Sequence, residues 1–347
     1  MLQIHRDHPL DRLTTFGLKS IAEAYAEAHD AEELREAFAA AKREGWRVHV
    51  IGGGSNTIAM PRVRGLVLRA AMTGCRIEPL NEGGARVEAG AGELLDRVVR
   101  LSVSSGFGGL ENLAMIPGTV GGAVVQNVGA YGLELAERFE RCRAYDPDSD
   151  EIRTLSLEEC DFGYRHSVFK TPSAARLVVL SADLRLPGRW RPTAGYKDLA
   201  AQLSAERLAH PTPADVERVV RELRARKLPD PKQVGNAGSF FKNPVVNRVK
   251  ANELLSKHPS LTAYPLAGGR VKLAAAWLIE AAGLKGLKLG RAAVYARHAL
   301  ILVNEGGADG EDVAALSRLI VDRVKERFGV TLEPEPVVMG EAAGNIL

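Results

Sequence analysis

Two glycine-rich segments are the part of this sequence best suited to hold a ligand. The first, GGGSN at residues 52–56, follows a β-branched run, and the second, IPGTVGGAVVQNVGAYG at residues 116–132, contains five glycines. Glycine lets backbone N–H groups approach an anion closely, and such groups can hold a pyrophosphate without fixed positive charge. Neither segment has the GxGxxG or GK[ST] spacing of the common nucleotide-binding loops. We predict that together they grip a phosphate-containing cofactor.

Each glycine-rich segment also has a purely structural interpretation. GGGSN on its own is what a tight turn would look like. The second segment could be a structural loop, but Ile116, Val120 and Val124 make it more apolar than a solvent-facing linker, and they could pack an aromatic ring. The second segment is therefore the stronger indication of a ligand site.

Three further segments carry side chains that could react or bind charge. Arg165 lies among aromatic and apolar residues in CDFGYRHSVFK (160–170), where a guanidinium can hold a carboxylate or form a structural salt bridge. Ser239 lies between a glycine and two phenylalanines in NAGSFFKNP (236–244), and its hydroxyl can donate a hydrogen bond or a proton, or cap a helix. LEPEP (332–336) holds two carboxylates between prolines, as would suit a rigidly held acid, although surface glutamates can look the same.

The elements that must position these residues indicate an α+β fold. Asp30 to Gly45 has helical spacing with a capping residue at each end, and the strand-like run 46–51 leads from it into the first glycine-rich segment. Farther along, short strand patterns are interrupted by few helices, which favours a mixed sheet over a doubly wound parallel one. The expected strands are 65–69, 85–89, 141–146, 151–155, 177–186 and 299–304, and the further expected helices are 94–104, 212–227, 271–282 and 312–328.

Composition places the chain among ordinary globular proteins. It has 347 residues, of which 46% are hydrophobic and 26% charged, enough for two or three domains. The 46 basic and 43 acidic residues are spread along the chain, so no nucleic-acid partner is expected. Three widely spaced cysteines indicate neither a disulfide framework nor a zinc site, and no metal is expected. With no apolar signal core and no apolar run near the membrane-spanning length, we expect a cytoplasmic protein without a membrane partner.

Taken in order, the segments resemble the UDP-N-acetylenolpyruvoylglucosamine reductase (UDP-N-acetylmuramate dehydrogenase) family over essentially the whole chain. They are TTFGL (14–18), GGGSN (52–56), GLENLAMIPGTVGGAVVQNVGAYG (109–132), CDFGYRHSVFK (160–170), KLPDPK (227–232), NAGSFFKNP (236–244), AAWLIEAAGLKG (275–286) and LEPEP (332–336). WRPTAGYKDL (190–199) resembles the insertion of the type I subgroup. The resemblance implies an FAD-binding fold of the vanillyl-alcohol-oxidase (PCMH) type in two subdomains, plus a smaller α/β substrate-binding domain.

The resemblance also implies roles for individual residues. Three match catalytic residues of the family: Arg165, Ser239 and Glu335. Four match contacts to the UDP-sugar or to NADPH: Tyr164, Tyr196, Lys227 and Asn243, of which Tyr196 closes over the sugar. The residues that match the FAD-binding segments are Gly52, Gly53, Gly54, Ser55, Asn56, Ile116, Pro117, Gly118, Thr119, Gly121, Gly122, Asn127 and Gly129.

The reaction implied by the resemblance is the NADPH-dependent reduction of UDP-N-acetylglucosamine enolpyruvate to UDP-N-acetylmuramate in peptidoglycan precursor synthesis. Hydride passes from flavin N5 to the vinyl carbon, Arg165 and Glu335 stabilise the enolate, and Ser239 protonates the carbon alpha to the carboxylate. Two other functions share parts of the pattern: an FAD-dependent sugar or alcohol oxidase, and a non-catalytic flavin- or UDP-sugar-binding protein. The first does not account for NAGSFF or LEPE, and the second has no need of a proton donor.

The expected domain organisation combines the resemblance with the stiff linker LPDP at 228–231. Residues 1–70 and 71–226 are expected to form the two FAD-binding subdomains. Residues 227–328 are expected to form the substrate-binding domain, and residues 329–347 to pack back near the active site. We expect a monomer whose partners are small molecules, the UDP-sugar and NADPH.

Overall fold

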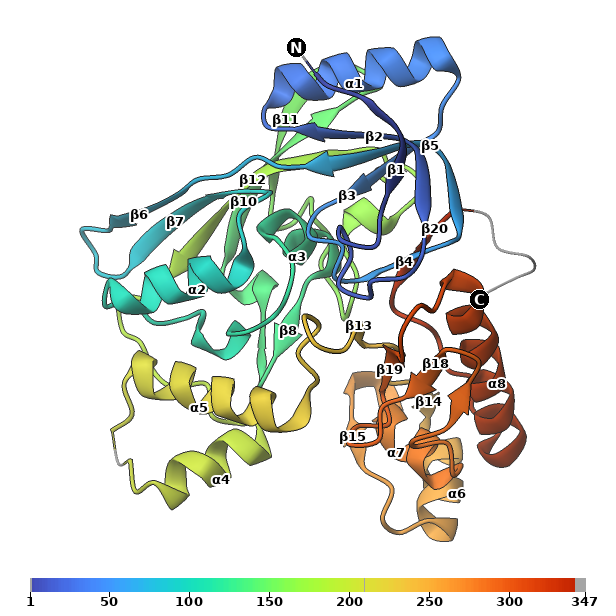
Figure 1. Cartoon of the computed structure of the whole chain (residues 1–347). Coiled ribbons are helices and arrows are strands. Elements are labelled where there is room, and N and C mark those ends of the chain that lie inside the picture. The colour runs from blue at the N-terminus through green and yellow to red at the C-terminus, as the bar shows by residue number, and fades with distance from the viewer. Residues whose placement is uncertain (1, 209, 341–347) are drawn as a thin grey trace. The chain divides into compact units, whose positions relative to one another are not determined.

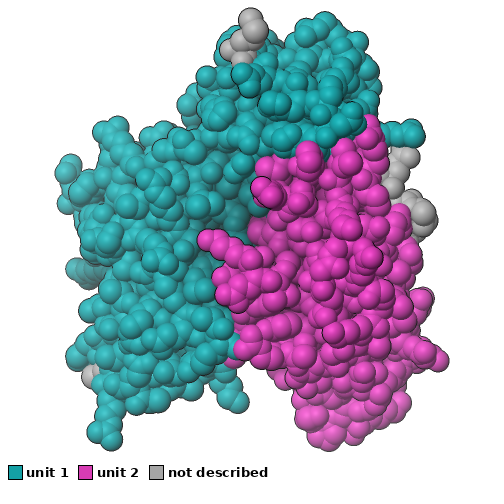
Figure 2. Space-filling model, in the orientation of Figure 1, with its two compact units in different colours: residues 1–8, 22–54, 64–226 teal, residues 9–21, 55–63, 227–347 magenta. Residues whose placement is uncertain are grey.

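The structure is a computed structural model that describes residues 2–208 and 210–340. Its helices and mostly antiparallel sheets form the predicted α+β fold (Figure 1). The chain divides into two compact units, coloured separately in Figure 2: unit 1 is residues 1–8, 22–54 and 64–226, and unit 2 is residues 9–21, 55–63 and 227–347. Each unit is therefore assembled from segments that are distant in the sequence.

The first sheet of unit 1 has the strand order β1–β2–β5–β3. Its strands are β1 (His5–Pro9), β2 (Ile21–Ala28), β3 (Val48–Ile51) and β5 (Arg62–Ala70). β3 runs parallel to β5, and Val48 pairs with Leu66. Because β3 ends at Ile51, the first glycine-rich segment leaves directly from the end of this sheet.

Helix α1 (Ala31–Glu44) confirms the first predicted helix and both of its capping residues. Asp30 accepts a hydrogen bond from the N–H of Glu33 at 2.8 Å, and Gly45 ends the helix in the left-handed conformation with φ of 67°. The apolar side chains that α1 and the sheet bury in one core include Leu34, Ala37, Ala41, Ala24, Ala26, Leu66 and Leu68.

The second sheet of unit 1 is antiparallel, with the order β11–β10–β12–β7–β6. Its strands are β6 (Cys75–Pro79), β7 (Ala85–Gly90), β10 (Phe139–Asp146), β11 (Glu151–Ser156) and β12 (Val178–Leu186). Five of the predicted strands are confirmed by β5, β7, β10, β11 and β12, whereas β6 was not predicted, and α2 (Leu95–Ser104) confirms the predicted helix at 94–104. Shorter elements of unit 1 are β8 (Gly129–Ala130), β9 (Leu133–Glu134), η1 (Glu111–Leu113), η2 (Leu135–Glu137) and η3 (Val168–Lys170).

The second glycine-rich segment differs from the predicted loop, because its middle forms helix α3 (Val120–Gln126). Gly121 and Gly122 are poor helix formers, so local propensity gives no sign of this helix. A tertiary contact anchors it: the N–H of Gly121 donates to the carbonyl of Ala91 at 2.8 Å. Asn127, with φ of 42°, ends the helix in the left-handed conformation.

Two further helices complete unit 1. α5 (Pro213–Lys227) confirms a predicted helix and its cap, since the Thr212 hydroxyl accepts from the N–H of Asp215 at 3.3 Å. α4 (Lys197–Ala205) has no counterpart among the predicted helices, and it buries only Leu199 and Leu203, too short an apolar pattern to stand out.

The described part of unit 2 contains three small sheets, three α-helices and one short 3-10 helix. The sheets have the orders β13–β19–β18–β17, β14–β16–β15 and β20–β4, of which the last is a parallel pair. The strands are β4 (Thr57–Ala59), β13 (Asn236–Ser239), β14 (Val245–Asn247), β15 (Ala263–Pro265), β16 (Arg270–Leu273), β17 (Lys288–Leu289), β18 (Ala292–Val294), β19 (Ile301–Asn304) and β20 (Val337–Met339). The helices are α6 (Arg248–Lys257), α7 (Ala275–Ala281), α8 (Gly310–Phe328) and the single turn η4 (Ala267–Gly269).

Two predictions in unit 2 are confirmed and one is wrong at its start. β19 and α8 confirm the strand at 299–304 and the helix at 312–328, which Gly329 ends with φ of 63°. The helix predicted for 271–282 begins only at Ala275, because residues 270–273 form β16 between β14 and β15. The short apolar run fits a buried strand as well as a helix, and pairing with distant strands decides the outcome.

The core of unit 2 draws on all three of its chain segments. Phe16, Leu18, Ile58 and Met60 from the N-terminal part are almost completely buried there. They pack in one cluster with apolar side chains from β13, α6, α7 and α8. The unit is therefore not a simple C-terminal domain.

Candidate functional site

The two glycine-rich segments lie against each other in unit 1. A Cβ atom on Gly52 would lie 2.3 Å from Oγ1 of Thr119, and a Cβ on Gly53 would lie 2.8 Å from Cα of Gly118. Both distances are too short for real atoms, so a side chain at either position would force the facing residue to move. Gly54 needs glycine for another reason, because its φ is 59°. The sequence prediction that these segments act together thus has a structural basis in their contact.

Thr119 has a buried hydroxyl that finds no hydrogen-bond partner among the described residues. The residue precedes α3 but its side chain does not cap the helix. A buried polar group without a partner is unfavourable, and a ligand oxygen would satisfy it. Gly122 lies beside it in open surroundings, since a Cβ there would meet nothing closer than Oγ1 of Thr119 at 3.8 Å.

Asn127 and Gly129 have structural contacts of their own. The Asn127 amide donates to the carbonyl of Gly163 at 2.9 Å, and its Oδ1 accepts from the N–H of Ala136 at 3.0 Å. The carbonyl of Gly129 accepts from Nη2 of Arg165 at 3.3 Å. These contacts join the end of the second glycine-rich segment to the segment that carries Arg165.

Arg165 occupies an unusual backbone conformation, with φ of 54°. Its guanidinium lies 5.3 Å from the ring centre of Tyr164, which is partly exposed. Its carbonyl accepts from Nζ of Lys170 at 3.0 Å, and the same ammonium donates to Oε1 of Gln126 in α3 at 2.9 Å. A left-handed residue that its neighbours hold in this way is a frequent feature of functional sites.

Ser239 and Glu335 are brought together in unit 2. Ser239 is the last residue of β13 and is exposed, while the next two side chains, Phe240 and Phe241, are buried and anchor the strand end. The N–H of Glu335 donates to the carbonyl of Phe240 at 2.8 Å, directly after Ser239. Asn56 also joins this group, since its amide donates to the carbonyl of Glu335 at 3.2 Å.

Further contacts join the segment that carries Ser239 to the segment that carries Glu335. The N–H of Lys242 donates to the carbonyl of Glu333 at 2.9 Å, and the same two side chains form an ion pair. Glu333 is therefore engaged with Lys242, which leaves Glu335 as the carboxylate of LEPEP whose backbone lies beside Ser239. Ser55 and Asn56 begin the part of the first glycine-rich segment that belongs to unit 2.

The predicted substrate contacts are distributed over both units. In unit 1, Tyr196 precedes α4 and packs edge-on against Tyr131, with ring centres 5.0 Å apart. In unit 2, Asn243 holds the start of α7, because its Oδ1 accepts from the N–H of Ala275 at 2.9 Å. Lys227 ends α5, and burial together with the positive charges of Lys227 and Lys285 lowers the pKa of His298.

Sequence reasoning passed over Asn112, which connects two of these segments. Its side chain is fully buried and its amide donates to the carbonyls of Tyr131 at 2.8 Å and Thr193 at 2.9 Å. It thereby joins the end of the second glycine-rich segment to the residues before Tyr196. The residue lies in the GLENLAM stretch, which only the family resemblance singled out.

A metal-binding cluster and a membrane-spanning helix are both absent from the described residues, 2–208 and 210–340. They contain no cluster of three or more His, Cys, Asp or Glu side chains arranged to hold a metal ion. No helix in this part of the chain combines the length and the apolar character needed to cross a bilayer.

Comparison with known proteins gives a family match in each half of the chain and relatives over nearly its whole length. Residues 22–155 match the FAD binding domain family, and residues 230–339 match the family described as UDP-N-acetylenolpyruvoylglucosamine reductase, C-terminal domain. The UDP-N-acetylenolpyruvoylglucosamine reductase of Azoarcus sp. (strain BH72) is 48% identical over 343 residues, 97% of this chain and 98% of that protein. The protein of the same name from Pseudomonas aeruginosa is 45% identical over 335 residues, 96% of this chain and 98% of that protein.

Solved structures agree with the sequence relatives. The crystal structure of UDP-N-acetylenolpyruvylglucosamine reductase from Thermus caldophilus superposes with a TM-score of 0.66 at 27% identity, covering 98% of this chain and all of that one. A solvent-stable cholesterol oxidase superposes with a TM-score of 0.50 at 12% identity, over 96% of this chain and 87% of that one. This second likeness concerns the fold alone, and it fits the expected FAD-binding fold of the vanillyl-alcohol-oxidase type.

Proposed function

Because the chain belongs to the UDP-N-acetylenolpyruvoylglucosamine reductase family, we propose that it reduces the enolpyruvyl group of UDP-N-acetylglucosamine enolpyruvate to UDP-N-acetylmuramate, with NADPH as reductant, in peptidoglycan precursor synthesis. The chain is an FAD-containing oxidoreductase. The observation that carries the proposed chemistry is the hydrogen bond from Glu335 to the carbonyl of Phe240. It brings the backbone of Glu335 beside the residue that follows Ser239, from a segment almost a hundred residues away in the sequence.

The glycine-rich segments fit the phosphates of FAD. The orphaned Thr119 hydroxyl can donate to a phosphate oxygen, and the backbone of Gly52 lies close to it because no side chain separates them. Gly122 has space above its backbone for a ligand to approach closely. The side chain of Asn127 is fully engaged with protein groups, so we expect it to shape the segment and to leave ligand contact to the backbone.

When bound, FAD supplies the hydride that adds to the terminal vinyl carbon of the substrate. That addition places negative charge on the carboxylate-bearing fragment as an enolate. We propose that the guanidinium of Arg165 binds this carboxylate, and that Glu335, in its protonated form or through a shared hydrogen bond, stabilises the enolate oxygen. Stabilisation of this kind is commonly worth about 3–4 kcal/mol for one well-placed donor.

Ser239 is the proposed proton donor to the carbon alpha to the carboxylate. Its position at the exposed end of β13 leaves the hydroxyl open to a substrate, while buried Phe240 holds the backbone in place. An isolated serine hydroxyl is a weak acid, so the alkoxide that it leaves is a strong base and must take up a proton from a neighbour. Lys227 or a chain of water molecules would serve, since either can return a proton to the oxygen after the transfer.

The remaining assignments concern binding and organisation. We propose that Tyr164, Tyr196, Lys227 and Asn243 contact the UDP-sugar or NADPH. We also propose two FAD-binding subdomains at 1–70 and 71–226 and a substrate-binding domain at 227–328, in a cytoplasmic monomer. The C-terminal segment 329–347 is proposed to lie near the active site; its residues 341–347 lie outside the described part of the chain.

The decisive experiment separates the two half-reactions in a Ser239→Ala variant. Bleaching of the flavin absorbance by NADPH should proceed as in the wild type, because the serine plays no part in it. Oxidation of the reduced flavin by the enolpyruvyl substrate should slow by about 100-fold or more, the usual loss when a general acid is removed. Ser256→Ala, which removes an exposed hydroxyl in α6 of the same unit, is the matched control.

The same measurement distinguishes the rival functions. A Ser239→Ala enzyme that turns over at nearly the wild-type rate would refute the proton-donor role. Substrate oxidation without NADPH, with release of peroxide, would indicate an oxidase. A protein that binds flavin and UDP-sugar without any turnover would be a binding protein.

A further inference from the structure

Met115 stands at the entrance to the second glycine-rich segment and has a left-handed backbone. Its φ is 59°, a value that residues with a side chain rarely adopt. Such a conformation persists only where neighbouring groups hold it. Three and four residues later, Gly118 and Thr119 pack against the first glycine-rich segment. The conformation of Met115 therefore determines how the chain enters that contact.

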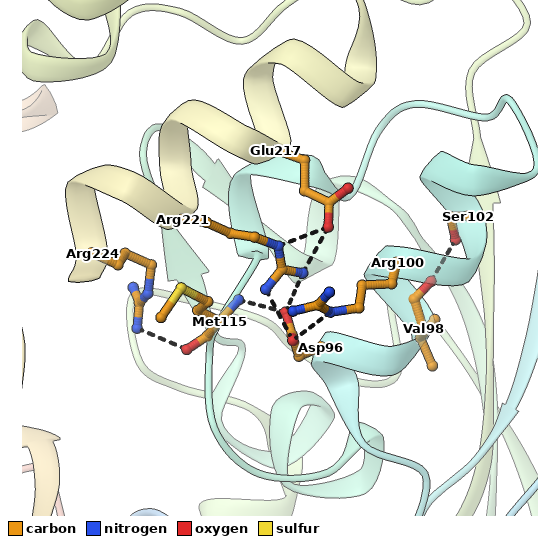
Figure 3. A network of polar contacts seen from close by, with 8 residues as sticks. All are labelled: Asp96, Val98, Arg100, Ser102, Met115, Glu217, Arg221 and Arg224. Atoms are coloured by element: carbon orange, nitrogen blue, oxygen red, sulfur yellow. Dashed lines mark hydrogen bonds and ion pairs between the residues drawn. The ribbon is translucent and has the colours of Figure 1, made fainter. Parts of the chain in front are cut away.

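Side chains from two helices hold both polar backbone groups of Met115 (Figure 3). Its N–H donates to Oδ1 of Asp96 in α2 at 2.6 Å, and its carbonyl accepts from Nη2 of Arg224 in α5 at 3.3 Å. The residue before Asp96 binds the same segment, since the N–H of Leu95 donates to the carbonyl of Gly118 at 3.1 Å. The first turn of α2 thus holds the segment at two points.

Asp96 is held in turn by charged side chains (Figure 3). Arg221 donates to both of its carboxylate oxygens, at 2.7 and 3.0 Å, and Nε of Arg100 donates at 3.2 Å. Glu217 accepts from Arg221 at 2.7 and 2.9 Å. Burial raises the pKa of Asp96, but the hydrogen bonds from Arg221 and from the N–H of Met115 outweigh it and leave the pKa below its ordinary value. The carboxylate is therefore ionised at neutral pH and fixed in direction.

We infer that Asp96 is a positioning residue for the cofactor. By holding the N–H of Met115 it sets the position of residues 116–119, and through them the affinity for FAD. The inference rests on the proposed binding of FAD to the glycine-rich segments. Arg221 and Arg100 act one step farther away, through the carboxylate.

The test measures the rate at which the purified holoprotein releases FAD after dilution, with the recovery of flavin fluorescence as the signal. Asp96→Ala should release FAD about tenfold faster, in line with the loss of one hydrogen bond to a charged group, and should alter the visible flavin spectrum. Asp96→Asn keeps an acceptor oxygen for the N–H of Met115, so its release rate should stay near that of the wild type. Ser104→Ala, which removes an exposed hydroxyl of α2 outside the network, is the matched control and should release FAD at the wild-type rate.

The Tm of each variant separates this positioning role from a purely structural role of the network. Arg221→Gln removes the bidentate ion pair, so it should lower the Tm at least as much as Asp96→Ala while accelerating FAD release less. FAD release that increases in step with the loss of Tm across the four variants would overturn the inference, as would a wild-type release rate in Asp96→Ala. If the chain did not catalyse the proposed reaction, the FAD release rates would still be as expected. A failure of the proposed function and a failure of the inference on Asp96 can therefore be told apart.

Discussion

At the scale of single residues, Gly52 and Gly122 differ in the space that an added side chain would find. Gly52 faces the Thr119 hydroxyl, whereas Gly122 has open space. Gly52→Ala should therefore lower the free energy of unfolding by about 1–3 kcal/mol, because the added methyl overpacks the contact between the two segments. Gly122→Ala, the matched control in the second glycine-rich segment, should leave the free energy of unfolding unchanged or raise it, since alanine favours the helix. Urea unfolding of the FAD-free proteins measures both effects.

The double variant Gly52→Ala/Thr119→Ala identifies the clash behind this prediction. Removal of the Thr119 hydroxyl takes away the atom 2.3 Å from the added methyl group, so most of the lost stability should return. A double variant as unstable as Gly52→Ala alone would show that some other contact limits the position.

Tyr145 makes the stability of unit 1 sensitive to alkaline pH. Burial and the hydrogen bond to Asp150, at 3.0 Å, raise the pKa of its phenol to about 12. Since the folded state holds this proton more tightly than the unfolded chain, the stabilisation is complete below pH 10 and is lost as the pH rises through 12. The loss should amount to about 2–3 kcal/mol at one pKa unit per ~1.4 kcal/mol.

The comparison with Tyr145→Phe isolates this contribution. At pH 8 the variant should be less stable by about 1 kcal/mol, the value of one hydrogen bond. Between pH 10 and 12 the wild type should lose stability relative to the variant, as measured by denaturant unfolding at each pH. A difference between the two proteins that does not change with pH would contradict the assignment.

At the scale of elements, the caps of α8 make a local contribution that a single substitution can measure. The Asp309 carboxylate accepts from the N–H groups of Glu311 and Asp312, at 2.9 and 3.1 Å, and the Asp312 carboxylate accepts from the N–H of Asp309. Asp309→Ala should cost about 1 kcal/mol of unfolding free energy. Asp322→Ala, the same change at an exposed position inside α8, should cost nothing or stabilise slightly. Equal losses in the two variants would argue against capping.

Elements whose ends are set by nearby residues are the ones that could be predicted from sequence. Asp30 and Gly45 bound α1, and Thr212 starts α5, through contacts within a few residues. The start of α7 is different, because residues 270–273 take the strand conformation only when β14 and β15 pair with them. Helix α3 likewise depends on tertiary contacts that cannot be predicted from its glycine-containing sequence.

The candidate site shows the same division between local and distant information. Its glycine-rich segments and the residue types at 165, 239 and 335 are visible in the sequence, and the family resemblance gave them roles. The hydrogen bond between Glu335 and Phe240 and the contact of Gly52 with Thr119 join residues far apart in the chain. Asn112 was passed over because its importance lies in two carbonyls that only the folded chain brings to it.

At the scale of the whole molecule, the two units differ in their dependence on distant chain segments. The core of unit 1 is made of residues before 227, whereas unit 2 buries Phe16, Leu18, Ile58 and Met60 from the N-terminal part. A fragment of residues 1–226 should therefore unfold cooperatively. A fragment of residues 227–347 should lack a sharp transition, because four of its large core side chains and the partner strand of β20 are missing.

Near-UV circular dichroism during urea unfolding tests this prediction for both fragments. The control is the C-terminal fragment mixed with the N-terminal fragment, which supplies segments 9–21 and 55–63 and should restore the transition. Cooperative unfolding of residues 227–347 alone would show that the N-terminal segments are dispensable for the unit.

The discontinuous make-up of unit 2 also bears on how the chain matures during its synthesis. Its second segment ends at residue 63 and its third begins at residue 227, so the 163 residues between them must be translated before the two can meet. At about 5–20 residues per second this takes roughly 10–30 seconds on the ribosome. Throughout that interval Phe16, Leu18, Ile58 and Met60 have emerged without the helices that bury them, and the nascent chain is then a natural client for chaperones that bind exposed apolar segments.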